Sequence, residues 1–329
     1  MGNGYKWAAP TRLLLVVGLL AISLAGQAQI SSPTTWQSDL YTDHPLVGRI
    51  WSTADAAFIS PGELTDRLVS ARYILLGEKH DNADHHDLQM NVLSYLLAAG
   101  KADRVAFEML DDSVAGQLQE LPSREGLDAD ALKAWLRWDE EGWNWDFYGP
   151  LLQAVYESAT PLFAANISQA AVGQIYGDEN AIDVGGILAE QAQEQLILDI
   201  DESHCGLLPE SQFPAMVRVQ QARDMAMAEA LGLPDAGKLS VLVAGNYHAR
   251  QDLGVPNYLL AGNDTLERSQ ILSLSFMEVQ PEETDPLAYQ QVFSRQPAFD
   301  YIWFTPALTS TDYCASLQQS ARQQSHASR

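Results

Sequence analysis

The densest group of reactive side chains follows a short apolar run near residue 76. Glu78 and His80 are two residues apart on an extended or turning segment, so both can point into one pocket. His86 and Gln89 are three apart on one predicted helical face, and Asn82 lies between the two pairs. Imidazoles and carboxylates are ligands of zinc, iron or manganese, and they also act as general bases and acids. These side chains therefore predict a ligand site with metal or acid–base chemistry.

Polar groups also follow later strand-like runs. Glu108 ends one such run, where an unpaired carboxylate would be unfavourable, so it is predicted to be functional or to pair with Arg104 or Arg250. Asn166 ends another run, and His248 follows a third after a glycine. Arg250, two residues further on, is a candidate for binding an anionic group.

The ends of these runs are expected to meet. In open α/β sheets, ligands bind in the crevice beyond the carboxyl ends of the strands. We therefore predict that Glu78, His80, Glu108 and His248 share one site, either as metal ligands or as catalytic residues. The alternative for Glu78 is a structural role, in which it caps the helix that follows.

Other candidates are less specific. His204 and the adjacent Cys205 could supply ligands, and Arg223, within a polar stripe of a Met- and Ala-rich helix, could neutralise a carboxylate or pair with Asp224. The aromatic residues between 135 and 148 are predicted to be helical core, with a flat ligand wall as the alternative.

The pattern of elements predicts an α/β fold, with a mostly parallel sheet flanked by helices and a smaller helical subdomain. The strand, helix, strand order over residues 73–109 is typical of parallel neighbours. Strand patterns are absent from residues 111–159, which we predict to be a helical insertion in an α/β domain made of residues 29–110 and 160–329. Further predictions are an edge strand at 46–51, helices at 61–70, 84–99 and 213–231, a long helical region at 169–199, and strands at 160–167, 239–244, 270–279 and 301–305.

The composition excludes some partners. The chain has 329 residues, 47% of them hydrophobic, and a formal net charge of −24. This is enough apolar material for a full core. The negative charge opposes binding to nucleic acid or to an anionic membrane surface. No glycine-rich phosphate loop or Gly-x-Ser-x-Gly elbow occurs.

The amino terminus has the order of a secretory signal. Lys6 and Arg12 precede an uncharged apolar stretch over residues 13–25, and small residues follow to Ala28. We expect residues 1–28 to be a signal peptide and the protein to be exported to the periplasm or cell envelope. An uncleaved anchor is the alternative. The mature chain is expected to contain no transmembrane segment, and no cysteine near residues 26–29 could accept a lipid.

The two cysteines of the chain, Cys205 and Cys314, are far apart in sequence. In an oxidising compartment they could form one disulfide that ties the carboxyl-terminal segment to the body of the protein. Two free thiols are the alternative.

An ordered set of motifs resembles the ChaN family of the haem-binding uptake, Tiki-like superfamily. That superfamily also holds erythromycin esterases and metal-dependent proteases. The similarity runs from about residue 46 to residue 314. Its motifs are residues 76–82, 85–89, 107–110, 204–209, 221–224 and 245–256.

The resemblance implies a haem- or iron-binding envelope protein that takes part in iron acquisition, with haem near the interface of a homodimer. It also implies a tyrosine as haem ligand, for which Tyr176 and Tyr247 are the candidates. Arg223 or Arg250 would meet the haem propionates. Many members of the family resemble lipoproteins, whereas this chain lacks the cysteine that would carry the lipid.

The resemblance leaves a second function open. Relatives in the superfamily use the positions that match Glu78, His80, Glu108 and His248 for hydrolysis or metal binding. The alternative is therefore a metal-dependent esterase or peptidase, with a divalent transition metal as its cofactor.

Overall fold

The computed structural model of the chain describes residues 1–2, 29–122, 126–293, 296–311, 313–315 and 317. Nearly all of the predicted signal peptide, residues 3–28, lies outside this described part, so it stays a prediction. No helix among the described residues is both long and apolar enough to cross a membrane.

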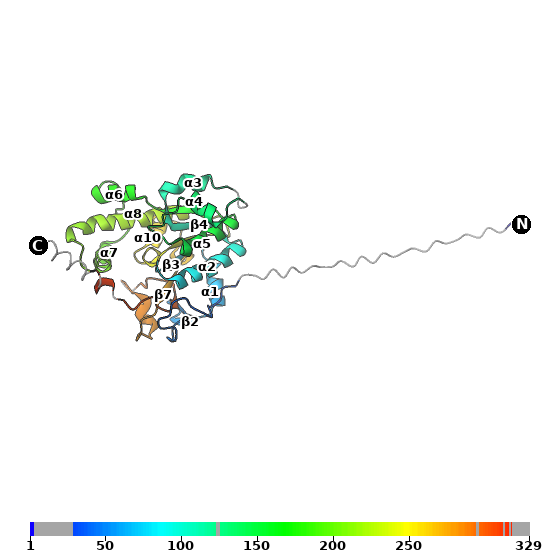
Figure 1. Cartoon of the computed structure of the whole chain (residues 1–329), viewed down its shortest axis with the longest axis horizontal. Helices are drawn as coiled ribbons and strands as arrows, with labels where there is room; N and C mark the ends of the chain where they lie inside the picture. Colours follow the sequence, from blue (N-terminus) through cyan, green and yellow to red (C-terminus); the bar gives the residue numbers. More distant parts are fainter. Residues whose placement is uncertain (3–28, 123–125, 294–295, 312, 316, 318–329) are drawn as a thin grey trace.

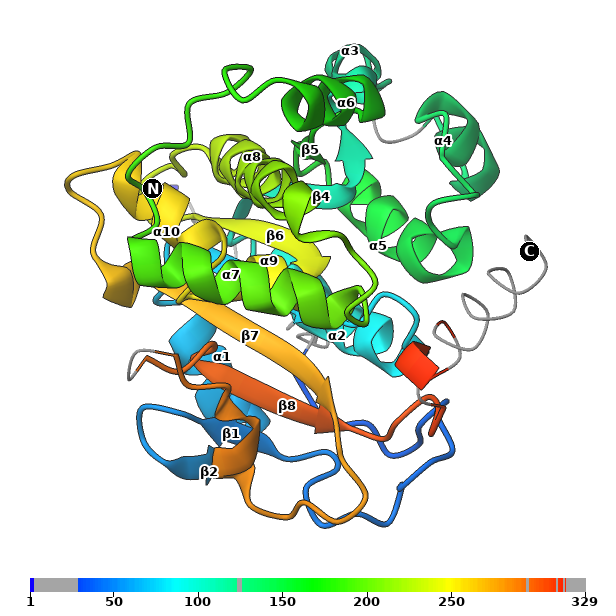
Figure 2. The same cartoon turned by 90° about the vertical axis from the view of Figure 1, so that its left-hand side faces the viewer.

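One sheet of eight strands forms the centre of the molecule (Figure 2), in the order β2-β1-β8-β7-β3-β6-β4-β5. The six strands from β8 to β5 run parallel, whereas β1 and β2 pair antiparallel at one side. The predicted α/β fold with a mostly parallel sheet is confirmed. The strands are β1 (Ile50–Ser52), β2 (Ala57–Ile59), β3 (Tyr73–Glu78), β4 (Ala102–Asp111), β5 (Leu162–Asn166), β6 (Leu239–Gly245), β7 (Ile271–Glu278) and β8 (Tyr301–Thr305).

Helices cover both faces of the sheet (Figure 1). Successive strand residues point to opposite faces, so Leu76 belongs to the hydrophobic cluster that includes residues of α1, α2 and α5, while Leu75 belongs to the cluster that includes residues of α8 and α10. Strands covered on both faces are apolar throughout, which explains the continuous apolar runs in the sequence. The α-helices are α1 (Pro61–Leu68), α2 (Ala83–Ala98), α3 (Ala115–Gln119), α4 (Ala129–Trp135), α5 (Trp145–Glu157), α6 (Gln169–Gly177), α7 (Glu190–Ser203), α8 (Phe213–Leu231), α9 (Asn246–Ala249) and α10 (Val255–Ala261).

Local capping explains where the two helices on either side of β3 begin. Ser60 and Glu63 form a capping box at the start of α1, with Pro61 as the first helical residue. The side chain of Asn82 accepts hydrogen bonds from the backbone N–H groups of Asp84 and His85, which starts α2 directly after the polar segment at the end of β3.

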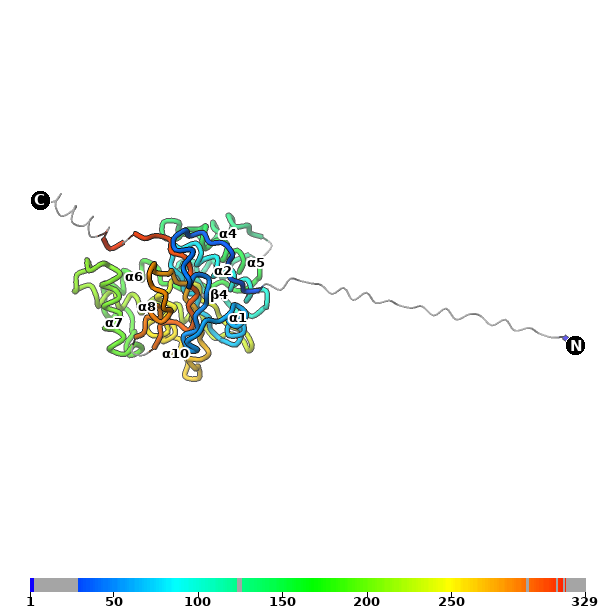
Figure 3. The backbone as a smooth tube through the Cα atoms, turned by 90° about the horizontal axis from the view of Figure 1, so that it is seen from below, coloured from blue at the N-terminus to red at the C-terminus, as the bar shows by residue number. Residues whose placement is uncertain are grey.

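The predicted edge strand at residues 46–51 is wrong in extent and in position. The strand is β1, which lies between β2 and β8, and β2 forms the edge. Gly48 has φ +78°, a turn conformation that an extended strand does not allow. Figure 3 shows this amino-terminal segment, in blue, against the orange-red segment that contains β8.

The predicted long helical region at residues 169–199 consists of two helices. α6 ends at Gly177 and α7 begins at Glu190. Gly185 and Gly186 lie between them, and Gly186 has φ +79°, so a continuous helix is disfavoured. Between β4 and β5 the described residues contain helices and no strand. Residues of α5 share the hydrophobic core of the sheet. The division into domains stays a prediction.

Cys205 and Cys314 form a disulfide, with their Cα atoms 5.1 Å apart. The bond joins the segment after α7 to the segment after β8, across a sequence separation of 109 residues. It therefore ties the carboxyl-terminal segment to the helical layer that contains α7.

Candidate functional site

Five ionisable side chains alternate between carboxylate and imidazole at the carboxyl ends of β3, β4 and β6. Asp224 Oδ1 lies 2.6 Å from His248 Nδ1, and His248 Nε2 lies 3.4 Å from Glu108 Oε1. Glu108 Oε1 lies 3.9 Å from His80 Nε2, and His80 Nδ1 lies 2.6 Å from Glu78 Oε1. We call these five residues the carboxylate–imidazole chain. The structure thus brings together Glu78, His80, Glu108 and His248, and it adds Asp224.

The parallel register explains this convergence. Glu78 at the end of β3 lies opposite Gly245 at the end of β6, and His248 follows on α9. The backbone N–H of Gly245 donates to Glu108 Oε2 at 2.7 Å. A Cβ atom at Gly245 would lie 2.8 Å from Cε1 of His80, so the close approach of backbone and imidazole requires glycine here.

The contacts within the carboxylate–imidazole chain fix its charges. Burial raises the pKa of Glu108, but the charge and hydrogen bond of His248 outweigh this effect and lower that pKa to about 2. Burial lowers the pKa of His248, but Glu108 and Asp224 raise it to about 10. Burial likewise lowers the pKa of His80, whereas the hydrogen bond and charge of Glu78 raise it to about 9. At neutral pH both imidazoles are therefore cationic.

Asp224 is one end of the carboxylate–imidazole chain, and Tyr148 contacts Glu78 at the other end. The sequence identified neither Asp224 nor Tyr148 as a site residue. Burial raises the pKa of Asp224 to about 6 despite the adjacent His248, and Asp224 Oδ2 is buried without a hydrogen-bond partner among the described residues. The hydroxyl of Tyr148 donates to Glu78 Oε1 at 2.9 Å. The polar stripe of α8 was the available signal for Asp224; Tyr148 belongs to an aromatic group that the sequence assigned to core.

Asn82 and Asn166 stabilise the backbone around the site. Asn82 caps α2, and its Nδ2 donates to Glu278 Oε1 at 2.7 Å. The side chain of Asn166 donates to the backbone carbonyl of Glu108 at 3.0 Å. Both residues therefore position the segments that carry the charged groups.

His86 and Gln89 have a similar supporting role on α2. His86 Nε2 lies 3.2 Å from the backbone carbonyl of His80, and its ring stacks on Phe147. Gln89 donates to the carbonyl of Leu76 at 2.9 Å. These contacts fix the turn that presents His80.

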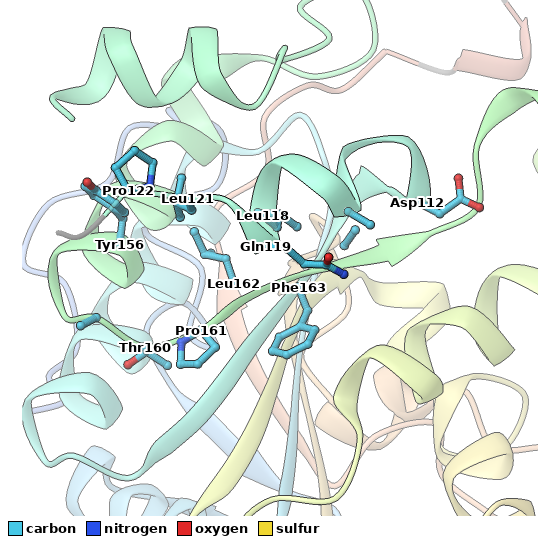
Figure 4. A pocket seen from close by; sticks show the side chains of 13 residues that line it. Asp112, Leu118, Gln119, Leu121, Pro122, Tyr156, Thr160, Pro161, Leu162 and Phe163 are labelled. Carbon is cyan, nitrogen blue, oxygen red and sulfur yellow. The ribbon is translucent and has the colours of Figure 1, made fainter. Parts of the chain in front are cut away.

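A cavity of about 460 Å³ lies beside the carboxylate–imidazole chain, and we call it the crevice cavity. Its walls include Glu78, His80, His248, Phe276, Met277 and Glu278. A separate cavity of about 470 Å³ lies between α3 and β5, where Leu118, Leu121 and Phe163 contribute apolar side chains (Figure 4). The two cavities share no lining residue.

Tyr247 and Arg250 lie near the crevice cavity, but their polar groups are already bonded. The Tyr247 hydroxyl donates to Asp199 Oδ2 at 2.8 Å, and burial together with this bond raises the pKa of Tyr247. The Arg250 guanidinium makes two hydrogen bonds to Asp252, at 2.9 and 2.7 Å.

Tyr176, His204 and Arg223 are not among the described residues that line the crevice cavity. Tyr176 lies on α6 and is 37% exposed. His204 Nδ1 lies 2.7 Å from the backbone carbonyl of Ile200 at the end of α7. Arg223 lies on α8, and its Nε is buried without a hydrogen-bond partner in the part of the chain that the structure describes.

The predicted metal site at Glu78, His80, Glu108 and His248 is not supported. No group of three or more His, Cys, Asp or Glu side chains among the described residues is arranged to hold a metal ion. The physical reason is that each imidazole directs both ring nitrogens towards carboxylates of the chain. Both imidazoles are protonated at neutral pH, so they do not direct lone pairs to a common point.

Comparison with known proteins identifies the family. The model of the family described as "Haem-binding uptake, Tiki superfamily, ChaN" matches residues 64–259. The chain belongs to the ChaN family. The match includes the whole carboxylate–imidazole chain, so the family resemblance inferred from the sequence motifs is confirmed.

A solved structure shares the fold of this ChaN family member. ChaN of Campylobacter jejuni, whose structure is described as showing cofacial haem binding, is 24% identical; the alignment covers 82% of this chain and 98% of that chain with a TM-score of 0.65. An erythromycin esterase, EreC, is 14% identical over 66% of this chain and 73% of its own, with a TM-score of 0.39, too low to support an inference. A search of curated proteins finds no significant match.

Proposed function

We propose that this protein binds haem at the crevice cavity as an exported, homodimeric component of iron acquisition. The observation that carries the proposal is membership of the haem-binding uptake family over residues 64–259. The crevice cavity supports it, because its volume is within the range of small-molecule sites and it combines apolar walls with a few polar groups.

His80 is the residue of the carboxylate–imidazole chain best suited to ligate the haem iron. Its side chain is 45% exposed, whereas Glu78, Glu108 and His248 are buried. Its Nδ1 is bonded to Glu78, and ligating histidines usually donate their second N–H to a carboxylate in this way. Its Nε2 lies 3.9 Å from Glu108, beyond hydrogen-bond distance.

The proton on His80 Nε2 must leave before this atom can bind a metal ion. Since the pKa of His80 is raised to about 9, haem affinity should increase as the pH rises from 7 to 9. Ligation by Tyr176, on the exposed face of α6, or by Tyr247 would also require loss of a proton, from a phenol. Of the predicted propionate partners, Arg250 is already paired with Asp252. Lys79 is a further cation at the crevice, and it is paired with Glu278 and Asp81.

Titration of the purified protein with haemin tests the proposal. We expect a saturable Soret band that is lost in His80→Ala and retained in His204→Ala, a control at the end of α7. Loss in Tyr176→Phe or Tyr247→Phe instead would keep the haem site and replace its ligand. A titration without saturable spectral change would remove the proposal.

Export and assembly need separate measurements. Amino-terminal sequencing of protein recovered from the cell envelope should find a mature chain that begins near residue 29. Sedimentation with and without haemin should detect a dimer. A full-length chain in the cytoplasm, or a monomer under both conditions, would contradict these parts of the proposal.

Hydrolysis of an ester or peptide is the second candidate. Glu78 Oε2 is buried beside the crevice cavity and has no hydrogen-bond partner among the described residues, so it could accept a proton from a water molecule. Glu78→Gln would then abolish turnover of model esters. A transition metal found by elemental analysis, and lost in Glu78→Gln, would favour the metal-dependent form.

A further inference from the structure

The amino-terminal end of the sheet holds a cavity with the opposite electrostatic character to the crevice cavity. This cavity, of about 620 Å³, lies before β3, β4 and β6, and we call it the amino-end cavity. Three cations line it: Arg72, Lys101 and Lys238. Asp235 is the one carboxylate among its described lining residues, so three positive charges and one negative charge give a formal charge of +2. The whole chain, in contrast, carries −24.

None of these three cations has a carboxylate within ion-pair distance in the described part of the chain. Six other lysines and arginines do form ion pairs with carboxylates: Arg67, Lys79, Arg104, Lys133, Arg250 and Arg268. Arg72 instead donates to the carbonyl of Pro234 at 3.2 Å, and Lys238 donates to the carbonyl of Gly100. Neutral carbonyl groups therefore orient these two side chains but leave their charges uncompensated.

We propose that the amino-end cavity binds a phosphate monoester. A phosphate monoester carries about −1.5 to −2 charges at neutral pH, which matches the formal charge of the cavity. Arginine and lysine are the side chains that recognise its oxygens. The cavity is larger than a phosphate group, and Val69, Leu233 and Leu239 provide apolar walls for the organic part of the ligand.

The amino-end cavity is distinct from the crevice cavity. Tyr73 begins β3 and Glu78 ends it, so the two cavities are separated by roughly 17 Å of strand. They share no lining residue. Binding at one can therefore be measured while the other is left intact.

The phosphate monoester has two sources, a soluble metabolite or the headgroup of a phospholipid. We would titrate the full-length protein with inorganic phosphate and with glycerol 3-phosphate by calorimetry. In parallel we would measure sedimentation with phosphatidylcholine vesicles that do or do not contain phosphatidic acid.

Lys101→Gln is the main variant, because no contact of its side-chain amine would be lost in the described structure. We expect about tenfold weaker binding, the effect of losing one charge-assisted hydrogen bond. Lys133→Gln removes the same charge from α4, where Lys133 pairs with Glu140, and should leave binding unchanged. Lys101→Arg should retain most of the affinity.

Glycerol 3-phosphate binding that depends on Lys101 supports a soluble ligand, and Lys101-dependent sedimentation with phosphatidic acid supports a headgroup. Absence of both, or binding that Lys101→Gln and Lys133→Gln weaken equally, overturns the proposal. Far-ultraviolet circular dichroism verifies that each variant is folded.

Discussion

Oε1 of Glu108 lies 3.4 Å from Nε2 of His248, and both side chains are buried. The same oxygen lies 3.9 Å from Nε2 of His80. Glu108 is thus the shared counter-charge of two imidazolium groups that the sequence separates by 168 positions, from His80 to His248. Because a buried charge is stable only when it is paired, the central carboxylate controls the charge of the whole arrangement.

Glu108→Gln should lower the free energy of unfolding by about 3 kcal/mol, since it leaves the buried His248 with one carboxylate partner less. It should also lower the pKa of both histidines, which NMR titration of their ring protons would measure. Glu140→Gln removes an exposed carboxylate paired with Lys133 and should change stability by less than about 1 kcal/mol. Equal losses in the two variants would contradict the proposed role of Glu108.

The stability of the protein should decrease between pH 7 and pH 10. The folded-state pKa values of His80 and His248 are raised to about 9 and about 10. Stabilisation from a raised pKa is fully present below the unfolded value, near 6.5, and is lost as the pH rises through the folded value. Urea denaturation at pH 7, 8.5 and 10 would measure this decrease, which should be smaller in His248→Gln. A wild-type stability that does not change with pH over this range would show that the imidazoles are neutral.

Gly245→Ala should disturb His80 without unfolding the protein. The backbone at Gly245 has φ −62°, which alanine adopts readily, but the added Cβ would lie 2.8 Å from Cε1 and 2.9 Å from Nε2 of His80. The imidazole must therefore move, and we expect haemin binding to weaken at least tenfold. Gly173→Ala is a matched control, because a Cβ there meets nothing within 4 Å. Unchanged haemin affinity in Gly245→Ala would show that the position of His80 does not matter for binding.

The sequence could predict most of the fold and four residues of the carboxylate–imidazole chain, because each of the four follows an apolar strand and parallel neighbours end at the same edge. Asp224 could not be predicted in the same way, since its side chain reaches the site from α8, and the polar stripe of that helix does not by itself define how the helix is rotated against the sheet. The metal prediction lacks support for a related reason. Residue types identify potential ligands, but only distances reveal that His80 and His248 are engaged with carboxylates.

Removal of the disulfide should reduce the stability of the protein. Cys205 and Cys314 are separated by 109 residues, and cross-links that close long loops stabilise proteins by about 2–4 kcal/mol. The Cys205→Ser, Cys314→Ser double variant should therefore unfold at a lower urea concentration than the oxidised wild type. A reducing agent should lower the wild-type midpoint to that of the variant and leave the variant unchanged. A wild-type midpoint that does not respond to reduction would contradict a stabilising role.

Glu78→Gln should shift the pH dependence of haem binding towards lower pH. The hydrogen bond and the negative charge of Glu78 oppose the effect of burial and raise the pKa of His80, so the amide should release the imidazole proton more readily. If His80 Nε2 binds the iron, the pH at which affinity reaches half its maximum should fall by about one unit. Tyr148→Phe removes a neutral donor to Glu78 Oε1 and keeps the carboxylate, so its midpoint should shift less. Haemin titrations from pH 6 to pH 10 would measure all three midpoints. Identical midpoints in the wild type and in Glu78→Gln would exclude His80 as the ligand. A shifted midpoint would implicate His80, because no other candidate ligand is bonded to Glu78 in the described structure except the buried Tyr148.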